Sequence, residues 1–310
     1  MNIAVLGAGA MGSLFGGYLS SGNNVTLVDL SESIVNAIRG EGVRIREKDG
    51  SISICNPSAV TDSSSIGQQD LVIVFVKSMY TVSALEENRN LIGPSTYLMT
   101  LQNGAGHESK LLKFADRKHV IIGSTQHNSS IIEPGFINHG GAGITSIGLL
   151  DGNSNVLSDI AADFSACGIE CRTEENVQKQ IWNKLFTNTA ASSLTALFQV
   201  PLGFIHDDPD ASWIMRNLCR EAVDVANGLG LAFDEEAVMQ EVDAVCANAP
   251  QGFTSIYADI KDGRKSEVDT ISGSVVETAH DLGLSVPYHE MLVKCIHALE
   301  AKNRKEKKHE

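Results

Sequence analysis

The stretch that decides the fold is Asn2-Ile3-Ala4-Val5-Leu6-Gly7-Ala8-Gly9-Ala10-Met11-Gly12, near the start of the sequence. An apolar run typical of a buried strand leads directly into glycines at GxGxxG spacing, and a helical pattern follows. In such a turn Gly7 permits a tight bend, Gly9 lets the backbone approach a diphosphate, and Gly12 lets helix and strand pack closely. The stretch therefore predicts a dinucleotide site at the positive end of the helix. A plain glycine-rich turn is the alternative. The residues expected to bind the cofactor there are Gly7, Ala8, Gly9, Ala10, Met11 and Gly12.

The next predicted strand ends at an acidic residue, Asp29. A carboxylate at that place accepts hydrogen bonds from the adenosine ribose hydroxyls and repels a 2′-phosphate. The following residues, Leu30–Ser33, offer no Arg or Lys that could hold such a phosphate. These observations favour NADH over NADPH, and the alternative is that Asp29 only caps the next helix.

Short apolar runs alternate with amphipathic segments up to about residue 101. The runs expected to form buried strands are Asn2–Leu6, Val25–Val28, Leu71–Val76 and Tyr97–Leu101. The segments expected to form helices are Ala10–Ser20, Glu32–Arg39 and Val82–Asn90. This alternation predicts an α/β fold of the Rossmann type, with a doubly wound parallel sheet and right-handed crossovers. Val43–Glu47 and Ser51–Cys55 predict a hairpin inserted in that sheet.

The pattern changes after about residue 175, beyond which no strand is expected. The segments with helical spacing are Glu175–Phe198, Ala211–Gly228, Asp234–Ala247 and Ser266–Leu282. We therefore predict a dinucleotide-binding domain over residues 1–174 and an all-α C-terminal domain over residues 175–310, with the chemistry in the groove between them. The mixed charges of Ala301–Glu310 predict a frayed, solvated tail.

Composition excludes several classes of function. The 310 residues carry 24 Lys and Arg against 38 Asp and Glu, and this net charge of −14 disfavours nucleic acid or an anionic membrane surface as a partner. No apolar run reaches the roughly 18 residues that span a bilayer, and no basic leader precedes the first strand, so a cytoplasmic protein is expected. The six cysteines lack metal-finger spacing, which predicts reduced core thiols rather than a disulfide or metal site.

The helix predicted from Glu175 is apolar around most of its circumference, which is typical of a buried helix. Yet Lys184, Asn188 and Ser192 recur at i, i+4 and i+8 and form one polar stripe. Lysine is almost never buried without a partner or a task. The stripe is therefore either the solvated face of the helix or the lining of a cleft, with Lys184 as proton donor or oxyanion stabiliser.

Further motifs stand in a fixed order along the chain. They are Val76-Lys77, Leu101-Gln102-Asn103-Gly104, Pro134-Gly135-Phe136-Ile137-Asn138-His139-Gly140-Gly141-Ala142-Gly143, Trp182-Asn183-Lys184-Leu185-Phe186-Thr187-Asn188, Ser255-Ile256-Tyr257-Ala258-Asp259-Ile260 and Ser266-Glu267-Val268-Asp269. With the glycine fingerprint, they make nearly the whole chain resemble the ketopantoate reductase (2-dehydropantoate 2-reductase) family. The resemblance implies a 6-phosphogluconate-dehydrogenase-like fold and NAD(P)H-dependent reduction of a 2-oxo acid. The reaction it most directly implies is 2-dehydropantoate to pantoate, in pantothenate and coenzyme A biosynthesis.

The resemblance also implies roles for individual residues. Lys184 falls on the family's catalytic acid. Glu267, twelve positions after Ser255, falls on a glutamate that orients the lysine or accepts a substrate hydroxyl. A surface helix carboxylate is the alternative for Glu267. The remaining implied positions are Asn103 beside the nicotinamide and the substrate, Lys77 near the cofactor or substrate, and Asn188, Ser192 and Ser255 on the substrate.

Three positions depart from the family's pattern. Ser192, Leu202 and Gly252 stand where members often carry asparagine. A pocket that loses such hydrogen-bonding groups should discriminate against ketopantoate. The alternatives are therefore a paralogue that reduces another 2-oxo acid with NADH, and a dinucleotide-sensing regulator without turnover. A methyltransferase finds no support in the helical half, and a homodimer stays open.

Overall fold

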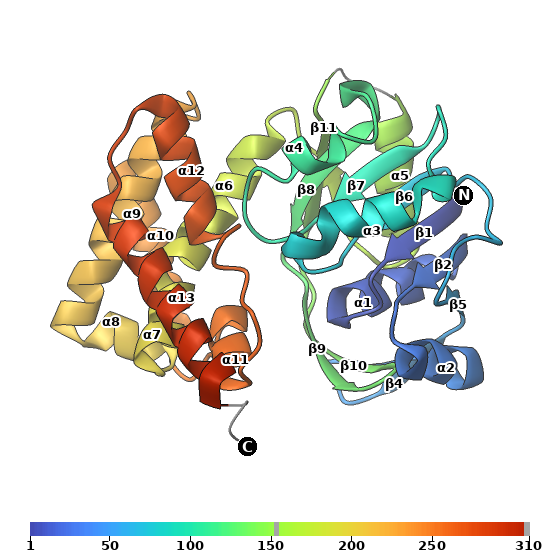
Figure 1. Cartoon of the computed structure of the whole chain (residues 1–310), viewed down its shortest axis with the longest axis horizontal. Coiled ribbons are helices and arrows are strands. Elements are labelled where there is room, and N and C mark those ends of the chain that lie inside the picture. Colours follow the sequence, from blue (N-terminus) through green and yellow to red (C-terminus); the bar gives the residue numbers. More distant parts are fainter. Residues whose placement is uncertain (152–154, 307–310) are drawn as a thin grey trace. The chain divides into compact units, whose positions relative to one another are not determined.

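The computed structural model describes residues 1–151 and 155–306. They divide into two compact units, each with its own apolar core. The first unit comprises Met1–Gln102 and His107–Val177, and the second comprises Asn103–Gly106 and Gln178–Glu310. The first is an α/β unit, and the described residues of the second form helices joined by turns and loops, without a strand, which confirms the predicted fold class (Figure 1). Asn103–Gly106 belong to the second unit although they lie far before residue 174 in the chain, so a single boundary does not describe the division completely.

The first unit is built on an eight-stranded sheet with the order β12-β11-β8-β7-β6-β1-β2-β5. All neighbours from β8 to β5 are parallel, whereas β11 is antiparallel to β8. The strand order reverses at β1, which lies between β2 and β6, and doubly wound sheets bind ligands at such a reversal. The strands are β1 (Asn2–Leu6), β2 (Asn24–Val28), β5 (Ser58–Val60), β6 (Leu71–Val74), β7 (Tyr97–Thr100), β8 (Val120–Thr125), β11 (Thr145–Leu149) and β12 (Cys171–Thr173).

Helices α1, α2 and α3 of this unit lie in the chain between strands of the main sheet, as the sequence predicts. Gly12 brings α1 close to the preceding turn, since a Cβ there would lie 1.8 Å from the Gly7 carbonyl oxygen. Phe15 of α1 packs against Phe164 of α5, with ring centroids 6.3 Å apart. The helices are α1 (Ala10–Leu19), α2 (Glu32–Glu41), α3 (Thr81–Glu87), α4 (Glu108–Leu111) and α5 (Asn155–Ala166), with short 3₁₀ turns at Ser78–Tyr80, Arg89–Leu91 and Arg117–His119.

The predicted hairpin exists, but its predicted place in the main sheet is wrong. β3 (Val43–Arg46) and β4 (Ile52–Cys55) pair in antiparallel fashion, and β3 then pairs with β10 (Phe136–Gly141), which pairs with β9 (Asn128–Glu133). These four strands form a separate sheet beside α1 (Figure 1). The reason is that β5 takes the edge of the main sheet next to β2.

The second unit consists of helices in which three predictions need correction. The predicted helix Glu175–Phe198 contains a π-helical segment, η4. The predicted helix Ser266–Leu282 begins only at Ser272, and Ala301–Glu306 continue the last helix rather than fraying. Residues 307–310 lie outside the described chain. The elements are α6 (Val177–Thr187), η4 (Asn188–Ser192), α7 (Ser193–Phe198), α8 (Leu202–Asp207), α9 (Pro209–Gly228), α10 (Glu235–Asn248), α11 (Ser255–Lys261), α12 (Ser272–Leu282) and α13 (Pro287–Glu306).

Two further features bear on function. Within residues 1–151 and 155–306, no helix is long and apolar enough to cross a membrane, and no three His, Cys, Asp or Glu side chains are grouped so that they could hold a metal ion. All six cysteines are free thiols, and four of them are buried.

Candidate active site

A pocket of about 570 Å³ opens at the carboxyl ends of β1, β2 and β6, where the strand order reverses. We call it the dinucleotide pocket. Four of the residues predicted to bind the cofactor line it: Gly7, Gly9, Asp29 and Lys77. A ligand-binding cavity at this place is what a doubly wound sheet leads one to expect.

The glycine turn shapes the floor of the dinucleotide pocket. Gly7 has φ +96°, and a Cβ there would lie 2.9 Å from the Val76 backbone nitrogen, so only glycine fits. Gly9 is the N-cap of α1, and a Cβ built on it meets nothing within 4 Å. The start of α1, with Ala10 and Met11 partly exposed, is therefore open to a diphosphate.

Asp29 holds this turn together from the end of β2. Its Oδ2 accepts a hydrogen bond from the Ala8 N–H at 2.7 Å, and its Oδ1 accepts one from the Ser31 N–H at 2.9 Å. The second bond is a local turn at the entry to α2, whose N-cap is Ser31. A carboxylate has about four lone-pair sites, so these two bonds leave capacity for ribose hydroxyls.

The charges around the dinucleotide pocket are mainly negative. Asp29, Asp62 and Glu87 line it together with Lys77, the basic side chain of its described lining. Hydrogen bonds from the backbone and side chain of Ser64 lower the pKa of the Asp62 carboxyl, which keeps it ionised. A 2′-phosphate in this pocket would therefore lie near several like charges. The sequence reading singled out Asp29 but missed Asp62 and Glu87, which follow no motif.

The second unit gathers three other predicted residues into one group, which we call the lysine cluster: Lys184, Asn103 and Glu267. Lys184 is half-buried at the end of α6, and its Nζ donates a hydrogen bond to Asn103 Oδ1 at 2.9 Å. Burial lowers the pKa of Lys184 to about 8, while the negative charge of Glu267 acts in the opposite direction. The ammonium group is thus charged at neutral pH and close to releasing its proton.

A close backbone contact positions Asn103 relative to the Glu267 turn. Gly104 has φ +103°, and a Cβ there would lie 1.8 Å from the Thr270 carbonyl oxygen. That same oxygen accepts a hydrogen bond from the Ala105 N–H at 3.2 Å. The Glu267 carbonyl in turn accepts the N–H of Thr270 at 3.1 Å. The Asn103–Gly106 segment therefore lies directly on the turn that begins at Glu267.

A buried carboxylate anchors the residue before Glu267. Glu300, which is 4% exposed on α13, accepts hydrogen bonds from the Ser266 N–H at 2.9 Å and from the Ser266 hydroxyl at 2.7 Å. Because these bonds fix the backbone in a turn, α12 starts only at Ser272. Glu267 is consequently half-buried in a turn and does not lie on a surface helix.

The other predicted substrate residues lie on η4 and α11. Asn188 is half-buried at the start of η4, one turn beyond Lys184, whereas Ser192 at its end is only 5% exposed. A π segment inserts an extra residue into the helical turn, so Ser192 does not continue an α-helical row. Ser255 is exposed at the start of α11, beside Thr254, whose hydroxyl donates to the Ser192 carbonyl at 3.2 Å.

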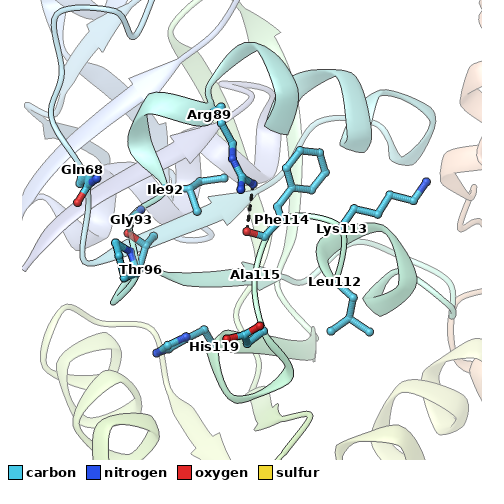
Figure 2. A pocket seen from close by; sticks show the side chains of 12 residues that line it. Gln68, Arg89, Ile92, Gly93, Thr96, Leu112, Lys113, Phe114, Ala115 and His119 are labelled. Atoms are coloured by element: carbon cyan, nitrogen blue, oxygen red, sulfur yellow. Dashed lines mark hydrogen bonds between the residues drawn. The ribbon is translucent and has the colours of Figure 1, made fainter.

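A second pocket in the first unit, of about 470 Å³, contains none of the predicted site residues. Figure 2 shows Arg89 pointing to Phe114, and its Nη1 donates to the Phe114 carbonyl at 3.0 Å. Gln68, Thr96 and His119 in its lining precede β6, β7 and β8, so this pocket lies at the amino edge of the parallel strands. Doubly wound sheets bind cofactors at the opposite, carboxyl edge.

Matches to known proteins extend over nearly the whole chain. A family model described as "Ketopantoate reductase PanE/ApbA" matches residues 3–152, and one for "Ketopantoate reductase PanE/ApbA C terminal" matches residues 176–300. The 2-dehydropantoate 2-reductase of Halobacterium salinarum is 33% identical over 290 residues, covering 93% of this chain and 95% of that protein. The Pyrococcus abyssi protein of the same name is 31% identical over 308 residues, covering 97% and 100%.

Solved structures agree with these matches. A ternary structure of D-mandelate dehydrogenase with NADH and anilino(oxo)acetate superposes with a TM-score of 0.92 at 27% identity, covering 98% of this chain and 99% of that one. A PanE/ApbA family ketopantoate reductase from Ralstonia eutropha gives a TM-score of 0.90 at 28% identity, covering 98% and 100%. Both likenesses span the α/β and the helical parts of the chain.

Proposed function

The chain belongs to the ketopantoate reductase family, and from this membership we propose that it reduces 2-dehydropantoate to pantoate with NADH as the preferred cofactor. Members are oxidoreductases that act on CH–OH groups with NAD(P), and the chain is an NAD(P)H-dependent 2-oxo acid reductase of this family. In the proposal, residues 1–174 bind the dinucleotide and residues 175–310 supply the acid and the substrate contacts.

The observation that carries the proposal is the state of Lys184. Its half-buried ammonium group is held by Asn103 Oδ1 at 2.9 Å, and its pKa is lowered to about 8. A lysine in this state is protonated at neutral pH and releases a proton more readily than an ordinary lysine. These are the properties that a general acid needs when negative charge develops on a substrate oxygen.

The proposed reaction is a hydride transfer coupled to a proton transfer. Bound NAD(P)H supplies the hydride for the carbonyl carbon of the 2-oxo acid. Lys184 Nζ donates a hydrogen bond to the carbonyl oxygen, stabilises its developing charge and transfers the proton that completes the hydroxyl group. Asn103 directs the ammonium group, and the charge of Glu267 keeps it protonated before the step. We assign Asn188, Ser192 and Ser255 to the substrate carboxylate and hydroxyl.

The preference for NADH is argued from the dinucleotide pocket. Gly7–Gly12 offer the helix N-terminus to the diphosphate, and Asp29 retains lone pairs for the ribose hydroxyls. Asp62 and Glu87 add negative charge to the lining. The extra phosphate of NADPH would have to bind against these carboxylates, with Lys77 as the basic side chain of that lining.

A second candidate substrate is a less hydroxylated, more apolar 2-oxo acid. Leu202 and Gly252 are in contact with each other: the Leu202 N–H donates to the Gly252 carbonyl at 2.9 Å, and a Cβ at Gly252 would lie 3.2 Å from Leu202 Cδ1. The two departures are thus neighbours, and a larger residue at 252 would also crowd the Ala249 carbonyl oxygen, 2.9 Å from the added Cβ. Phe253, stacked on Tyr257, is 55% exposed just before Ser255. The similar D-mandelate dehydrogenase acts on a 2-hydroxy acid that carries a phenyl ring.

A panel of 2-oxo acids assayed with NADH and with NADPH tests the proposal. We expect 2-dehydropantoate to give the highest kcat/KM of the panel, although the departures at Ser192, Leu202 and Gly252 should weaken its binding, and we expect NADH to exceed NADPH. A higher value for phenylglyoxylate would favour the second candidate. Nucleotide binding without turnover of any 2-oxo acid would favour the dinucleotide-sensing regulator, and light scattering on the same sample would test for a homodimer.

A further inference from the structure

A chain of buried polar side chains lies beneath the π segment that follows Lys184. It begins at Glu221 of α9, whose carboxylate accepts hydrogen bonds from the backbone N–H groups of Tyr288 and His289 at 2.9 and 3.0 Å. The same carboxylate lies 2.8 Å from Nδ1 of His289, a side chain that is 0% exposed. Because a carboxylate only accepts hydrogen bonds, Nδ1 carries a proton, and burial lowers the pKa of His289. The ring orientation is therefore fixed.

The chain continues from His289 to η4 and α12. Nε2 of His289 lies 2.9 Å from the Thr189 hydroxyl, which lies 3.2 Å from the Ser272 hydroxyl. Ser272 is also 3.1 Å from the hydroxyl of Ser193 on α7. Thr189, Ser193 and Ser272 are all 0% exposed. Every hydroxyl in this series has a hydrogen-bonding neighbour inside the helical core, as buried polar groups require.

The ends of this chain coincide with the segments that carry the lysine cluster. Thr189 is the second residue of η4, which continues directly from the helix that holds Lys184. Ser272 is the first residue of α12, which follows the turn that begins at Glu267. The hydrogen bond between the Thr189 and Ser272 hydroxyls therefore links the helical segment that follows Lys184 to the helix that follows the Glu267 turn. Single-turn π segments are frequent at functional sites, and this hydrogen bond ties one of them to the start of α12.

We propose that Thr189 is a positioning residue, which, through His289 and Ser272, holds Lys184 at its working distance from Glu267. This inference rests on the proposed reductase function and adds to it residues that touch neither the cofactor nor the substrate. A buried polar network that is fully satisfied rigidifies its surroundings, whereas apolar packing of the same shape allows small slips. Misplacement of a catalytic group by about 1 Å can cost about 100-fold in rate.

The test compares Thr189→Val, which keeps the shape and removes the hydroxyl, with Thr189→Ser, which keeps the hydroxyl. We expect Thr189→Val to lower kcat by at least about 10-fold, and Thr189→Ser to recover activity to within about threefold of the wild type. The Kd for NADH, measured by nicotinamide fluorescence, should stay within about twofold, because the dinucleotide pocket belongs to the other unit. Ser272→Ala interrupts the same chain from α12 and should behave as Thr189→Val does.

A matched control is Ser274→Ala, which removes a buried α12 hydroxyl that donates a hydrogen bond within its own turn, to the Ile271 carbonyl. It should lower Tm to a similar extent and leave kcat near that of the wild type. Full activity in Thr189→Val and Ser272→Ala would overturn the proposal. A Thr189→Ser variant as slow as Thr189→Val would also overturn it, because the Thr189 hydroxyl would then not be the group that positions Lys184.

A second readout does not depend on turnover. Acetylation of Lys184 by acetic anhydride, followed by peptide mass spectrometry across pH, reports the pKa of this amine. Loosening the cluster changes both the burial of Lys184 and its distance from Glu267, so Thr189→Val should move that pKa away from about 8. If the wild type reduces no 2-oxo acid, the proposed function fails, and this curve alone decides the positioning role. Identical curves for wild type and Thr189→Val would refute it.

Discussion

The dinucleotide pocket and the lysine cluster are built in opposite ways. The pocket depends on backbone: a glycine turn at φ +96°, the start of α1, and one carboxylate that binds two N–H groups. The cluster depends on side chains that three separate segments supply, at residues 103, 184 and 267. The backbone that forms the turn and the helix start belongs to one continuous motif, Gly7–Gly12. A site made of side chains exists only once distant segments have packed.

The dinucleotide pocket and the lysine cluster also differ in the group that provides positive charge for an anionic ligand. In the pocket, the positive end of α1 is available to a diphosphate although most of the charged lining is acidic. In the cluster, one half-buried ammonium group carries the positive charge, and the Glu267 carboxylate raises its pKa. The net charge of −14 is therefore matched by the acidic lining of the pocket, but it does not describe the lysine cluster. Substitutions that separate cofactor binding from proton transfer test this difference.

The largest separation is expected from Lys184→Ala. Loss of the proposed proton donor should lower kcat by about 100-fold or more, while the Kd for NADH stays within about twofold, since no pocket residue is changed. Steady-state kinetics and nicotinamide fluorescence measure the two quantities. Lys179→Ala, on the same helix, removes a lysine that contacts the Ala232 carbonyl and the Phe233 ring, and it should keep near-normal kcat. Turnover by Lys184→Ala close to that of the control would refute the role of Lys184.

The next effect is expected from Gly104→Ala. The added Cβ would lie 1.8 Å from the Thr270 carbonyl oxygen at φ +103°, so the Asn103 segment must move away from the Glu267 turn. We expect kcat to fall by between about 10- and 100-fold, and the free energy of unfolding to fall by about 2–3 kcal/mol, as for strained positive-φ sites that also clash. Urea titration and kinetics measure both.

Gly106→Ala provides the matched control for this substitution. Gly106 also has positive φ, at +78°, but a Cβ there meets nothing within 4 Å. It should therefore cost about 1 kcal/mol from backbone strain alone and have little effect on kcat. Equal kinetic losses in the two variants would show that the contact with Thr270 is unimportant for the cluster.

The sequence supports prediction of the pocket far better than of the cluster's geometry. The strand Asn2–Leu6, the glycine turn and Asp29 are local patterns, and the structure has β1 with those bounds. Lys184 was identified from the polar stripe and the family resemblance, and Asn103 and Glu267 from the resemblance alone, but the contact of Gly104 with Thr270 has no local signal. It depends on segments more than 160 residues apart, as their numbers show.

The errors in the predicted fold have the same cause. The β3–β4 hairpin follows from Asp49-Gly50, but its sheet is decided by β10, far along the chain. The start of α12 depends on Glu300, which holds Ser266 in a turn. The π segment Asn188–Ser192 could not be predicted, because its pattern of apolar and polar residues is also compatible with a regular α-helix. Local patterns predict elements, and non-local hydrogen bonds decide where they end and pair.

A smaller effect, confined to the pocket, is expected from Asp29→Ala. Removing this carboxylate withdraws an acceptor from the ribose hydroxyls and a negative charge from the 2′ position, so the ratio of kcat/KM for NADPH to that for NADH should rise by about 10-fold. The ratio is the measure, because loss of the bond to the Ala8 N–H weakens both cofactors. Glu86→Ala removes an exposed acid of α3 outside the pocket lining and should leave the ratio unchanged. An unchanged ratio in Asp29→Ala would mean that Asp29 serves only the turn.

The smallest effect, a displacement along the pH axis, is expected from Glu267→Gln. If Lys184 is the proton donor, as we propose, it must be charged, so kcat should fall as pH rises through its pKa of about 8. Burial lowers that pKa and the Glu267 charge raises it. Removing the charge therefore leaves the lowering cause unopposed, and the alkaline limb of the kcat profile should move to lower pH. Glu290→Gln, a partly exposed acid on α13 paired with His280, should leave the limb in place. If the limb in Glu267→Gln stayed near pH 8 or moved upward, the two charges would not be coupled, and the lysine cluster would reduce to Lys184 and Asn103.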